Sequence, residues 1–226
     1  MKILALETTD PVGSVAAMAD GKLLLEMDLN PQQRSARSLP PGIKTLLERV
    51  GWKSADVQLV ALTIGPGSFT GLRVGVTMAK TFAYSVGAEV FSVNTLDAIA
   101  EAAPANVSAL TAIIDAQRGD IVVRSYIRDL EGCINPTGDQ RLLPIDQWLE
   151  ELPVGMAVAG PVLSKIASRL PEHVTMLGHE YWTPRAGMVA KLAHRQYAAG
   201  RRDDLWTLLP QYSRRSAAEE KLKARR

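Results

Sequence analysis

A glycine-rich segment that joins an apolar strand to an amphipathic helix constrains the fold of this chain more than any other feature. Residues 65–73 read Gly-Pro-Gly-Ser-Phe-Thr-Gly-Leu-Arg. The run before them, 57–64, is mostly apolar, and after them apolar residues recur every three or four positions as far as Val86, which is typical of a helix. We expect a strand, a tight turn and a helix over residues 70–87, with Ser68 or Thr70 as its N-cap. The free N–H groups of its first turn would favour an anion or a partner.

The common phosphate-binding loops do not match this segment. No Gly-Lys pair followed by Ser or Thr is present at the spacing of a Walker loop. The dinucleotide-binding fingerprint fails at its third glycine, because that position is held by Thr70,. A tight turn without any ligand explains the spacing equally well.

Composition predicts an ordinary globular protein. The 226 residues are 46% hydrophobic and 22% charged, with a formal net charge of +2, so the chain as a whole has no strong attraction for nucleic acid. Basic residues nevertheless gather at the C-terminus. These are Arg214, Arg215, Lys221, Lys223, Arg225 and Arg226. A solvated, mobile tail is the simpler interpretation, and contact with RNA phosphates is the alternative.

The single cysteine, Cys133, excludes an internal disulfide and fits a reducing compartment. The first residues pass directly into a strand pattern, so we expect no signal peptide. No run approaches the roughly 18 apolar residues that span a bilayer. We therefore expect a cytoplasmic protein with no membrane segment.

The first half of the chain predicts an α/β architecture. Its first three strands should form an antiparallel meander with Asp20-Gly21 as a hairpin turn,. Pro40 and Pro41 fit the first turn of the next helix, and Gly51 fits its end. The expected elements are strands 2–7, 14–19 and 22–27, helix 38–50, strand 57–64, helix 70–87, strand 89–93 and a short helix capped by Asn94 or Thr95.

The second half should form another unit after a linker at residues 102–106. It also opens with a hairpin, whose first strand ends in Asp115. The expected elements are strands 109–114 and 121–127, helices 143–152 and 163–170, strand 155–159 and helix 186–199. We therefore divide the chain into lobes at 1–103 and 104–226, the second including the basic tail.

Few residues carry an obvious chemistry. Glu7-Thr8-Thr9 lies at a strand end, where two hydroxyls and a carboxylate could hold phosphate or a magnesium-bound water, although a plain polar turn is the favoured interpretation. His173, His179 and His194 show no metal-ligand spacing,. No Gly-x-Ser-x-Gly elbow is present. We expect no catalytic residue and no metal site.

The chain resembles the TsaB (YeaZ) family, bacterial components of the machinery that makes threonylcarbamoyladenosine in tRNA. The resemblance runs the whole length, and the nine residues 65–73 are its most specific part. The other matching stretches are Ile3–Thr9, the amphipathic 39–47, Ser92–Leu96, Ile114–Gly119 and Pro210–Arg214.

The resemblance implies an actin/sugar-kinase/Hsp70-like (ASKHA) fold of two ribonuclease-H-like lobes. It implies a non-catalytic subunit that scaffolds and activates TsaD, the threonylcarbamoyltransferase acting on adenosine 37. TsaE would join as an ATPase, and the chain would form a homodimer without TsaD. The histidine-containing metal motif of TsaD is absent here. No cofactor is thus expected on the isolated chain, ATP and metal are expected on partner subunits, and tRNA would be reached indirectly through the complex.

The resemblance also points to two sets of residues. The helix pair 38–50 and 70–87 would be the docking surface, although core burial is the stronger alternative for Met78 and Phe82. The partner-binding candidates are Leu39, Ile43, Leu46, Leu72, Val76, Met78 and Phe82. The family motif, a possible vestigial phosphate site, comprises Glu7, Thr8, Thr9, Gly65, Gly67, Ser68, Thr70, Gly71 and Arg73.

Position 7 is a departure, because nucleotide-binding members of the fold carry aspartate where this chain has Glu7. The extra methylene displaces the carboxylate and should spoil a magnesium-water site. Three other functions remain open: an ATP-binding phosphotransferase of the same fold, a glycoprotease, and a direct tRNA binder acting through the basic tail.

Overall fold

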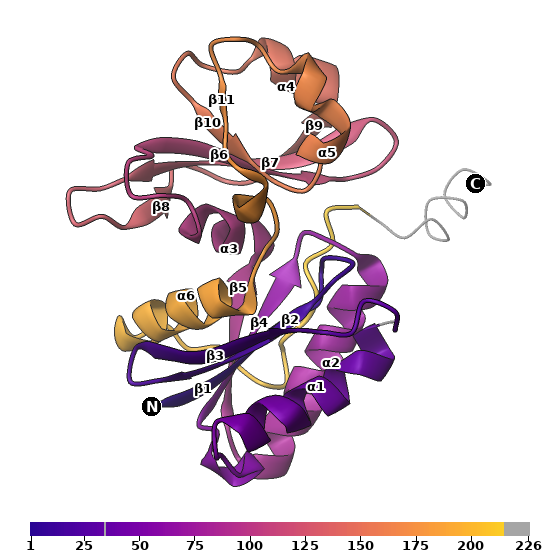
Figure 1. The fold of residues 1–226 in the computed structure, drawn as a ribbon, viewed down its shortest axis with the longest axis vertical. Helices are drawn as coiled ribbons and strands as arrows, with labels where there is room; N and C mark the ends of the chain where they lie inside the picture. The colour runs from indigo at the N-terminus through magenta and orange to yellow at the C-terminus, as the bar shows by residue number, and fades with distance from the viewer. Residues whose placement is uncertain (34, 215–226) are drawn as a thin grey trace.

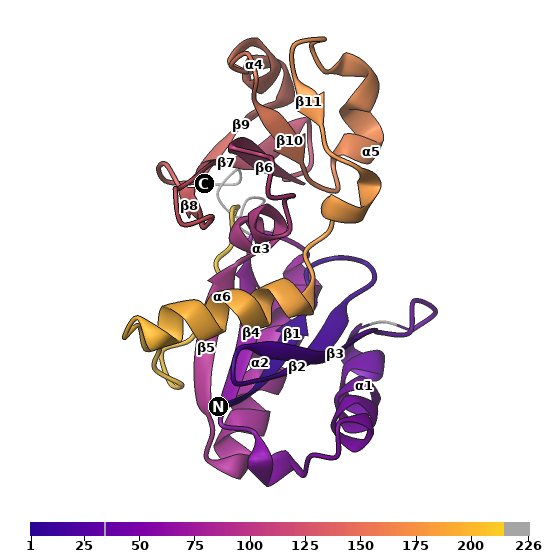
Figure 2. The same cartoon turned by 60° about the vertical axis from the view of Figure 1, so that its left-hand side comes forward.

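The computed structural model describes residues 1–33 and 35–214. Figures 1 and 2 show two lobes, one above the other, each built around one β-sheet. The C-terminal helix α6 (Ala186–Ala198) lies between them, across the lower sheet. Most of the predicted basic tail falls on residues 215–226, outside the described residues.

The lower lobe contains a five-stranded sheet in the order β3-β2-β1-β4-β5. The first three strands form the expected antiparallel meander, and β4 and β5 continue the sheet in parallel with β1. Asp20 and Gly21 both have positive φ, as a tight hairpin turn requires,. The strands are β1 (Lys2–Glu7), β2 (Ser14–Ala19), β3 (Lys22–Asp28), β4 (Leu59–Gly65) and β5 (Glu89–Asn94).

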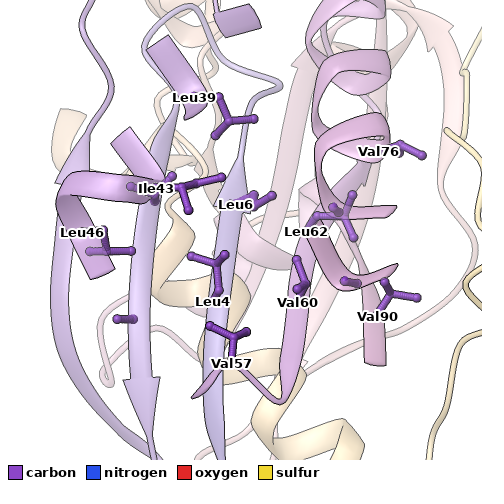
Figure 3. Packing of buried hydrophobic residues seen from close by; sticks show 14 of the residues in the cluster. Leu4, Leu6, Leu39, Ile43, Leu46, Val57, Val60, Leu62, Val76 and Val90 are labelled. Atoms are coloured by element: carbon purple, nitrogen blue, oxygen red, sulfur yellow. The ribbon is translucent and has the colours of Figure 1, made fainter. Parts of the chain in front are cut away.

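Helices cover both faces of the lower sheet. Because side chains alternate along a strand, Leu4 and Leu6 of β1 meet α1 (Ser35–Arg49) and α2 (Phe69–Val86) on one face. Ile3 and Ala5 meet α6 on the other face. Figure 3 shows the first of these layers, with Leu39, Ile43 and Leu46 of α1 beside the strands.

The sequence predicts the caps of α2 correctly but the start of α1 incorrectly. The side chain of Ser68 caps α2 by accepting a hydrogen bond from the Gly71 N–H, and Gly87 ends the helix with a φ of 73°, so both predictions are confirmed. The predicted start of the first helix, Ser38, is wrong by three residues, because α1 begins at Ser35. Pro40 and Pro41 therefore lie inside α1, beyond its first turn.

The upper lobe contains a six-stranded sheet in the order β11-β10-β6-β7-β8, with β9 also paired to β7. The expected hairpin is present as β6 (Ala109–Asp115) and β7 (Asp120–Arg128). The sequence pattern missed the strands at 134–136 and 175–176, and placed Leu143 in a helix although it belongs to β9. The remaining elements are β8 (Ile134–Pro136), β9 (Arg141–Pro144), α4 (Ile145–Glu150), β10 (Ala157–Ala159), α5 (Leu163–Ile166), β11 (Thr175–Met176) and the 3-10 turns η1 (Ser54–Asp56), η2 (Ala167–Arg169) and η3 (His179–Tyr181).

The two lobes exchange helices across the expected boundary at residues 103 and 104. That boundary separates the sheets. However, α3 (Thr95–Glu101) packs most of its apolar side chains on the upper sheet, and α6, from the second half, packs on the lower one. Glu101 joins the two helices by accepting from Arg195 and Lys191 of α6.

Candidate functional site

Three segments far apart in the sequence meet at the carboxyl ends of β1 and β4: the turn after Glu7, the glycine-rich segment and the C-terminal segment. The Thr8 hydroxyl donates to the Gly71 carbonyl oxygen over 2.8 Å. A β-carbon on Gly71 would lie 1.9 Å from the Thr8 carbonyl oxygen, and one on Gly75 would lie 2.4 Å from Thr8 Oγ1. Glycine at these two positions, four residues apart on one helix face, lets α2 lie directly against the turn.

Thr9 is enclosed on the other side of the same turn. Its N–H and its hydroxyl both donate to Glu7 Oε1, and its carbonyl oxygen accepts from the Ser68 N–H over 3.2 Å. A β-carbon on Gly67 would lie 2.5 Å from Thr9 Cβ. The hydroxyl protons of Thr8 and Thr9 are thus donated within the protein, as in the plain polar turn that the sequence favoured.

Glu7 lies completely buried beneath this turn. Its Oε1 also accepts from Thr63 over 3.4 Å, whereas Oε2 has no hydrogen-bond partner among residues 1–33 and 35–214. Burial raises the pKa of Glu7 to about 7 and the charge of Asp10 adds to the rise, although hydrogen bonds from Thr9 oppose it. Near neutral pH the neutral acid is therefore well populated, and a buried acid of this kind is a poor ligand for a magnesium-bound water.

The C-terminal segment closes the junction from outside. The Gln211 N–H donates to the Ile64 carbonyl oxygen over 2.7 Å, and a β-carbon on Gly65 would lie 2.1 Å from the Gln211 carbonyl oxygen. Tyr212 stacks on Phe69 with ring centroids 4.5 Å apart. Gly65 is therefore a contact for the C-terminal segment, which glycine spacing alone could not reveal.

Arg73 strengthens this closure. Its guanidinium lies 4.0 Å from the centroid of the Phe69 ring, and its Nε donates to the Tyr212 hydroxyl over 3.0 Å. Two residues after Tyr212, Arg214 forms an ion pair with Asp120 of the upper lobe. The C-terminal segment thus connects the lower lobe with the upper one.

A cleft of about 920 Å³ lies between the lobes. The lower lobe lines it with Thr9, Asp10 and the segment from Pro66 to Thr70, and the upper lobe with residues that include Asp115 and Lys165. Lys165 pairs with Asp115 over 2.5 Å. The cleft is large enough for a small molecule, whereas Glu7 does not reach its wall.

A second hollow, of about 400 Å³, lies on the outer surface between α1 and α2. Met78 and Phe82 line it together with Ile43, Leu47 and Trp52. Lys44, Glu48 and Lys53 supply charges around it. We call this feature, lined by Ile43, Leu47, Trp52, Met78 and Phe82, the helix-pair hollow.

Most of the predicted partner-binding residues lie elsewhere, which corrects the prediction for them. They belong to the wide apolar stripe of each helix that faces the sheet, so they are core residues. Four of the predicted residues have an exposed fraction of 6% or less and do not line the hollow: Leu39, Leu46, Leu72 and Val76. Ile43, Met78 and Phe82 reach the hollow. Sequence reasoning missed Trp52, although its position just after Gly51, at the end of the amphipathic α1, was a signal.

The described residues contain no group of three or more His, Cys, Asp or Glu that could hold a metal ion. Over the same part of the chain, no helix is both long enough and apolar enough to cross a membrane.

Comparison with known families matches residues 30–179 to a family model described as "TsaD: tRNA N6-adenosine threonylcarbamoyltransferase". Among curated proteins, the chain is 33% identical over 134 residues to the tRNA threonylcarbamoyladenosine biosynthesis protein TsaB of Escherichia coli (strain K12). That alignment covers 58% of this chain and 58% of the relative. The similarity therefore spans less than two thirds of the relative's length.

Two solved structures confirm the fold. YeaZ from Pseudomonas aeruginosa superposes with a TM-score of 0.81 at 25% identity, covering 93% of this chain and 99% of that one. The activator of the 2-hydroxyisocaproyl-CoA dehydratase from Clostridium difficile, with bound ADPNP, superposes with a TM-score of 0.50 at 8% identity, covering 90% and 100%. At so low an identity the second likeness concerns the fold alone. The ASKHA fold that the family resemblance implies is thus confirmed.

Proposed function

Because the chain belongs to the tRNA N6-adenosine threonylcarbamoyltransferase family, and within it to the TsaB (YeaZ) group, we propose that it is a non-catalytic subunit of the bacterial assembly that makes threonylcarbamoyladenosine at position 37 of tRNA. Its role is to bind and activate TsaD through the pair of helices α1 and α2. The cytoplasm, where tRNA is modified, is the corresponding location.

The helix-pair hollow is the observation that carries this proposal. Ile43 is buried, whereas Met78 and Phe82 remain partly exposed at its wall. Two helices from a partner, laid on α1 and α2, would complete a four-helix arrangement, and an apolar side chain from the partner could enter the hollow. Methionine suits such a contact because its flexible side chain adapts to the partner's shape.

The state of the family motif supports a non-catalytic role. The hydroxyls of Thr8 and Thr9 donate within the protein, and Glu7 is sealed from the cleft. A catalytic carboxylate must reach its substrate, which Glu7 does not. We accordingly place ATP and metal on the partner subunits, with TsaE joining as the ATPase, tRNA reached through the complex, and a second copy of the chain occupying the helix pair when TsaD is absent.

An ATP-binding phosphotransferase is the second candidate, favoured by one observation, the cleft of about 920 Å³ between the lobes. Isothermal titration of ATP and magnesium into the isolated chain distinguishes the two. A micromolar affinity with phosphate transfer favours the enzyme, and no heat of binding favours the scaffold.

The direct experiment mixes the chain with TsaD from the same organism and follows co-elution by size-exclusion chromatography. Formation of threonylcarbamoyladenosine is then measured with TsaD alone, with this chain alone and with both, in the presence of TsaE. We expect a stable pair, and product only when both are present. Product from this chain without TsaD, or no association at micromolar concentration, would contradict the proposal.

A further inference from the structure

The C-terminal segment, residues 200–214, is anchored on the lower lobe at several points. Asp203 accepts hydrogen bonds from the N–H and the hydroxyl of Ser92 on β5, over 2.6 and 2.7 Å. Leu208 is buried in the apolar layer that α1 and α2 form with the sheet. Lys80 of α2 donates to two carbonyl oxygens of the segment, over 3.0 and 3.3 Å. With the contacts of Gln211 and Tyr212 described above, these anchors fix the segment to the lower lobe.

The segment reaches the upper lobe at Arg214. This residue pairs with Asp120, the first residue of β7. Tyr212, Ser213 and Arg214 also line the cleft between the lobes. In Figure 1 the segment, in yellow, meets the upper lobe to the right of α3 and α6, the helices that join the lobes. The ion pair is therefore a second link between the lobes, separate from those helices.

The upper end of this link is well fixed without the C-terminal segment. Residues 117–119, just before Asp120, all have positive φ, at 63°, 58° and 82°, as in a tight hairpin turn. The Asp120 N–H donates to the Gln117 carbonyl oxygen over 3.1 Å, and the Ile145 N–H donates to that of Gly119 over 2.9 Å. The position of Asp120 is thus set within the upper lobe.

The ion pair between Arg214 and Asp120 is a weak link. The two side chains have exposed fractions of 23% and 27%, and ion pairs that water reaches contribute little to stability. Arg214 Nε is buried and has no hydrogen-bond partner among residues 1–33 and 35–214, which costs free energy in the paired state. The pair can therefore break while the anchors on the lower lobe hold.

The link through α3 and α6 is stronger. Glu101 of α3 accepts from both Arg195 and Lys191 of α6. Beside these helices, the Asn94 side chain donates to Gln140 Oε1 over 2.8 Å. Lobes joined by a firm link at one side and a weak one at the other move about the firm side, as in hinge motions. Any rotation of the lobes should therefore pivot near α3 and α6 and separate Arg214 from Asp120.

From these observations we propose that Arg214 and Asp120 form a latch that controls the width of the cleft. While the ion pair is made, the C-terminal segment holds the two lobes together beside the cleft. When it breaks, the lobes part at this end, the segment stays on the lower lobe, and a small molecule gains access to the cleft. The latch goes beyond the proposed function and does not depend on it, because both residues belong to the isolated chain.

The test measures the width of the cleft in the full chain by pulsed electron–electron resonance. Spin labels are placed at Thr70→Cys and Ser164→Cys, which are exposed and line the cleft from opposite lobes, in a Cys133→Ser background. We expect Asp120→Lys to raise the ratio of long to short distances about fivefold, the factor that one partly exposed ion pair supplies. Arg214→Glu should act in the same way, and the double variant, which restores the attraction with the charges exchanged, should return the wild-type distribution.

A matched control separates the latch from a general effect of charge. Asp146→Lys breaks an ion pair with Arg169 inside the upper lobe and should leave the distances unchanged. Hydrogen exchange of the Gln211 N–H should stay slow in Asp120→Lys, because the segment remains on the lower lobe.

Three results would overturn the latch. Unchanged distances in both single variants would show that the ion pair does not hold the lobes. A double variant that keeps the long distances would show that attraction between the two side chains is not the cause. Fast exchange of the Gln211 N–H in Asp120→Lys would mean that the whole segment detaches. Circular dichroism verifies folding, and the double variant decides the question if a single one does not fold.

Discussion

Thr8 and Gly71 fit so closely that no side chain can be added at position 71. The Thr8 hydroxyl donates to the Gly71 carbonyl oxygen over 2.8 Å, and the Thr8 carbonyl oxygen occupies the space that a β-carbon on Gly71 would need, at 1.9 Å. The Thr8 carbonyl oxygen belongs to the backbone, so it cannot move aside as the end of a flexible side chain can. The packing of the first turn of α2 on the turn after β1 therefore depends on this glycine.

Gly71→Ala should lower the free energy of unfolding by about 1–3 kcal/mol, the usual cost of overpacking. Helix propensity alone predicts the opposite sign, because alanine is favoured over glycine by about 1 kcal/mol inside a helix. Chemical denaturation followed by circular dichroism measures the effect. Gly138→Ala is the matched control, because a β-carbon there meets nothing within 4 Å; a stabilised Gly71→Ala protein would contradict the close packing.

Glu7→Gln should remove a pH dependence of stability. The pKa of Glu7 is about 7 in the folded protein against the ordinary 4.5, so between these values the folded state binds the extra proton and stability falls as pH rises. The wild-type protein should therefore lose about 3 kcal/mol, relative to Glu7→Gln, between pH 4 and pH 8. Denaturation curves of both proteins across this range measure the difference. If the free energies of unfolding of the two proteins differed by the same amount at every pH, the pKa of Glu7 would not be raised in the folded protein.

Glu101→Gln should weaken the link between α3 and α6. The Glu101 carboxylate has an exposed fraction of 4% and accepts from Arg195 over 3.1 and 3.0 Å and from Lys191 over 2.9 Å. We expect the free energy of unfolding to fall by about 1–3 kcal/mol, since hydrogen bonds to charged groups are lost. The exposed Lys191 and the partly exposed Arg195 limit the loss by regaining water. Glu48→Gln, at an exposed position paired only loosely with Lys44, should leave stability nearly unchanged. Equal effects of the two substitutions would mean that the contacts of Glu101 with Arg195 and Lys191 do not stabilise the folded protein.

Local signals predicted much of the lower lobe. Asp20-Gly21 placed the first hairpin, the Ser68 side chain caps the start of α2, and the left-handed backbone of Gly87 ends it. The family motif was also located correctly at the ends of β1 and β4. These features depend on neighbours in the sequence, and short-range chemistry suffices to find them.

Long-range contacts explain what the sequence could not predict. Nothing near Gly65 indicates that Gln211 would pack against it, and nothing in α3 or α6 indicates that each crosses to the other lobe's sheet. The same limit explains why Leu39 and Leu72 were proposed as contacts for a partner. An amphipathic pattern identifies the apolar face of a helix, but only the sheet beneath it decides which members of that face are covered.

The affinity of TsaD for wild-type and Met78→Glu proteins tests the central claim most directly. A carboxylate at the wall of the helix-pair hollow would have to lose its water on docking, so we predict association at least about a hundredfold weaker, with an unchanged circular dichroism spectrum. Val154→Glu, on the upper lobe, should bind as the wild type does. Undiminished affinity of a folded Met78→Glu protein would contradict the docking of TsaD on α1 and α2.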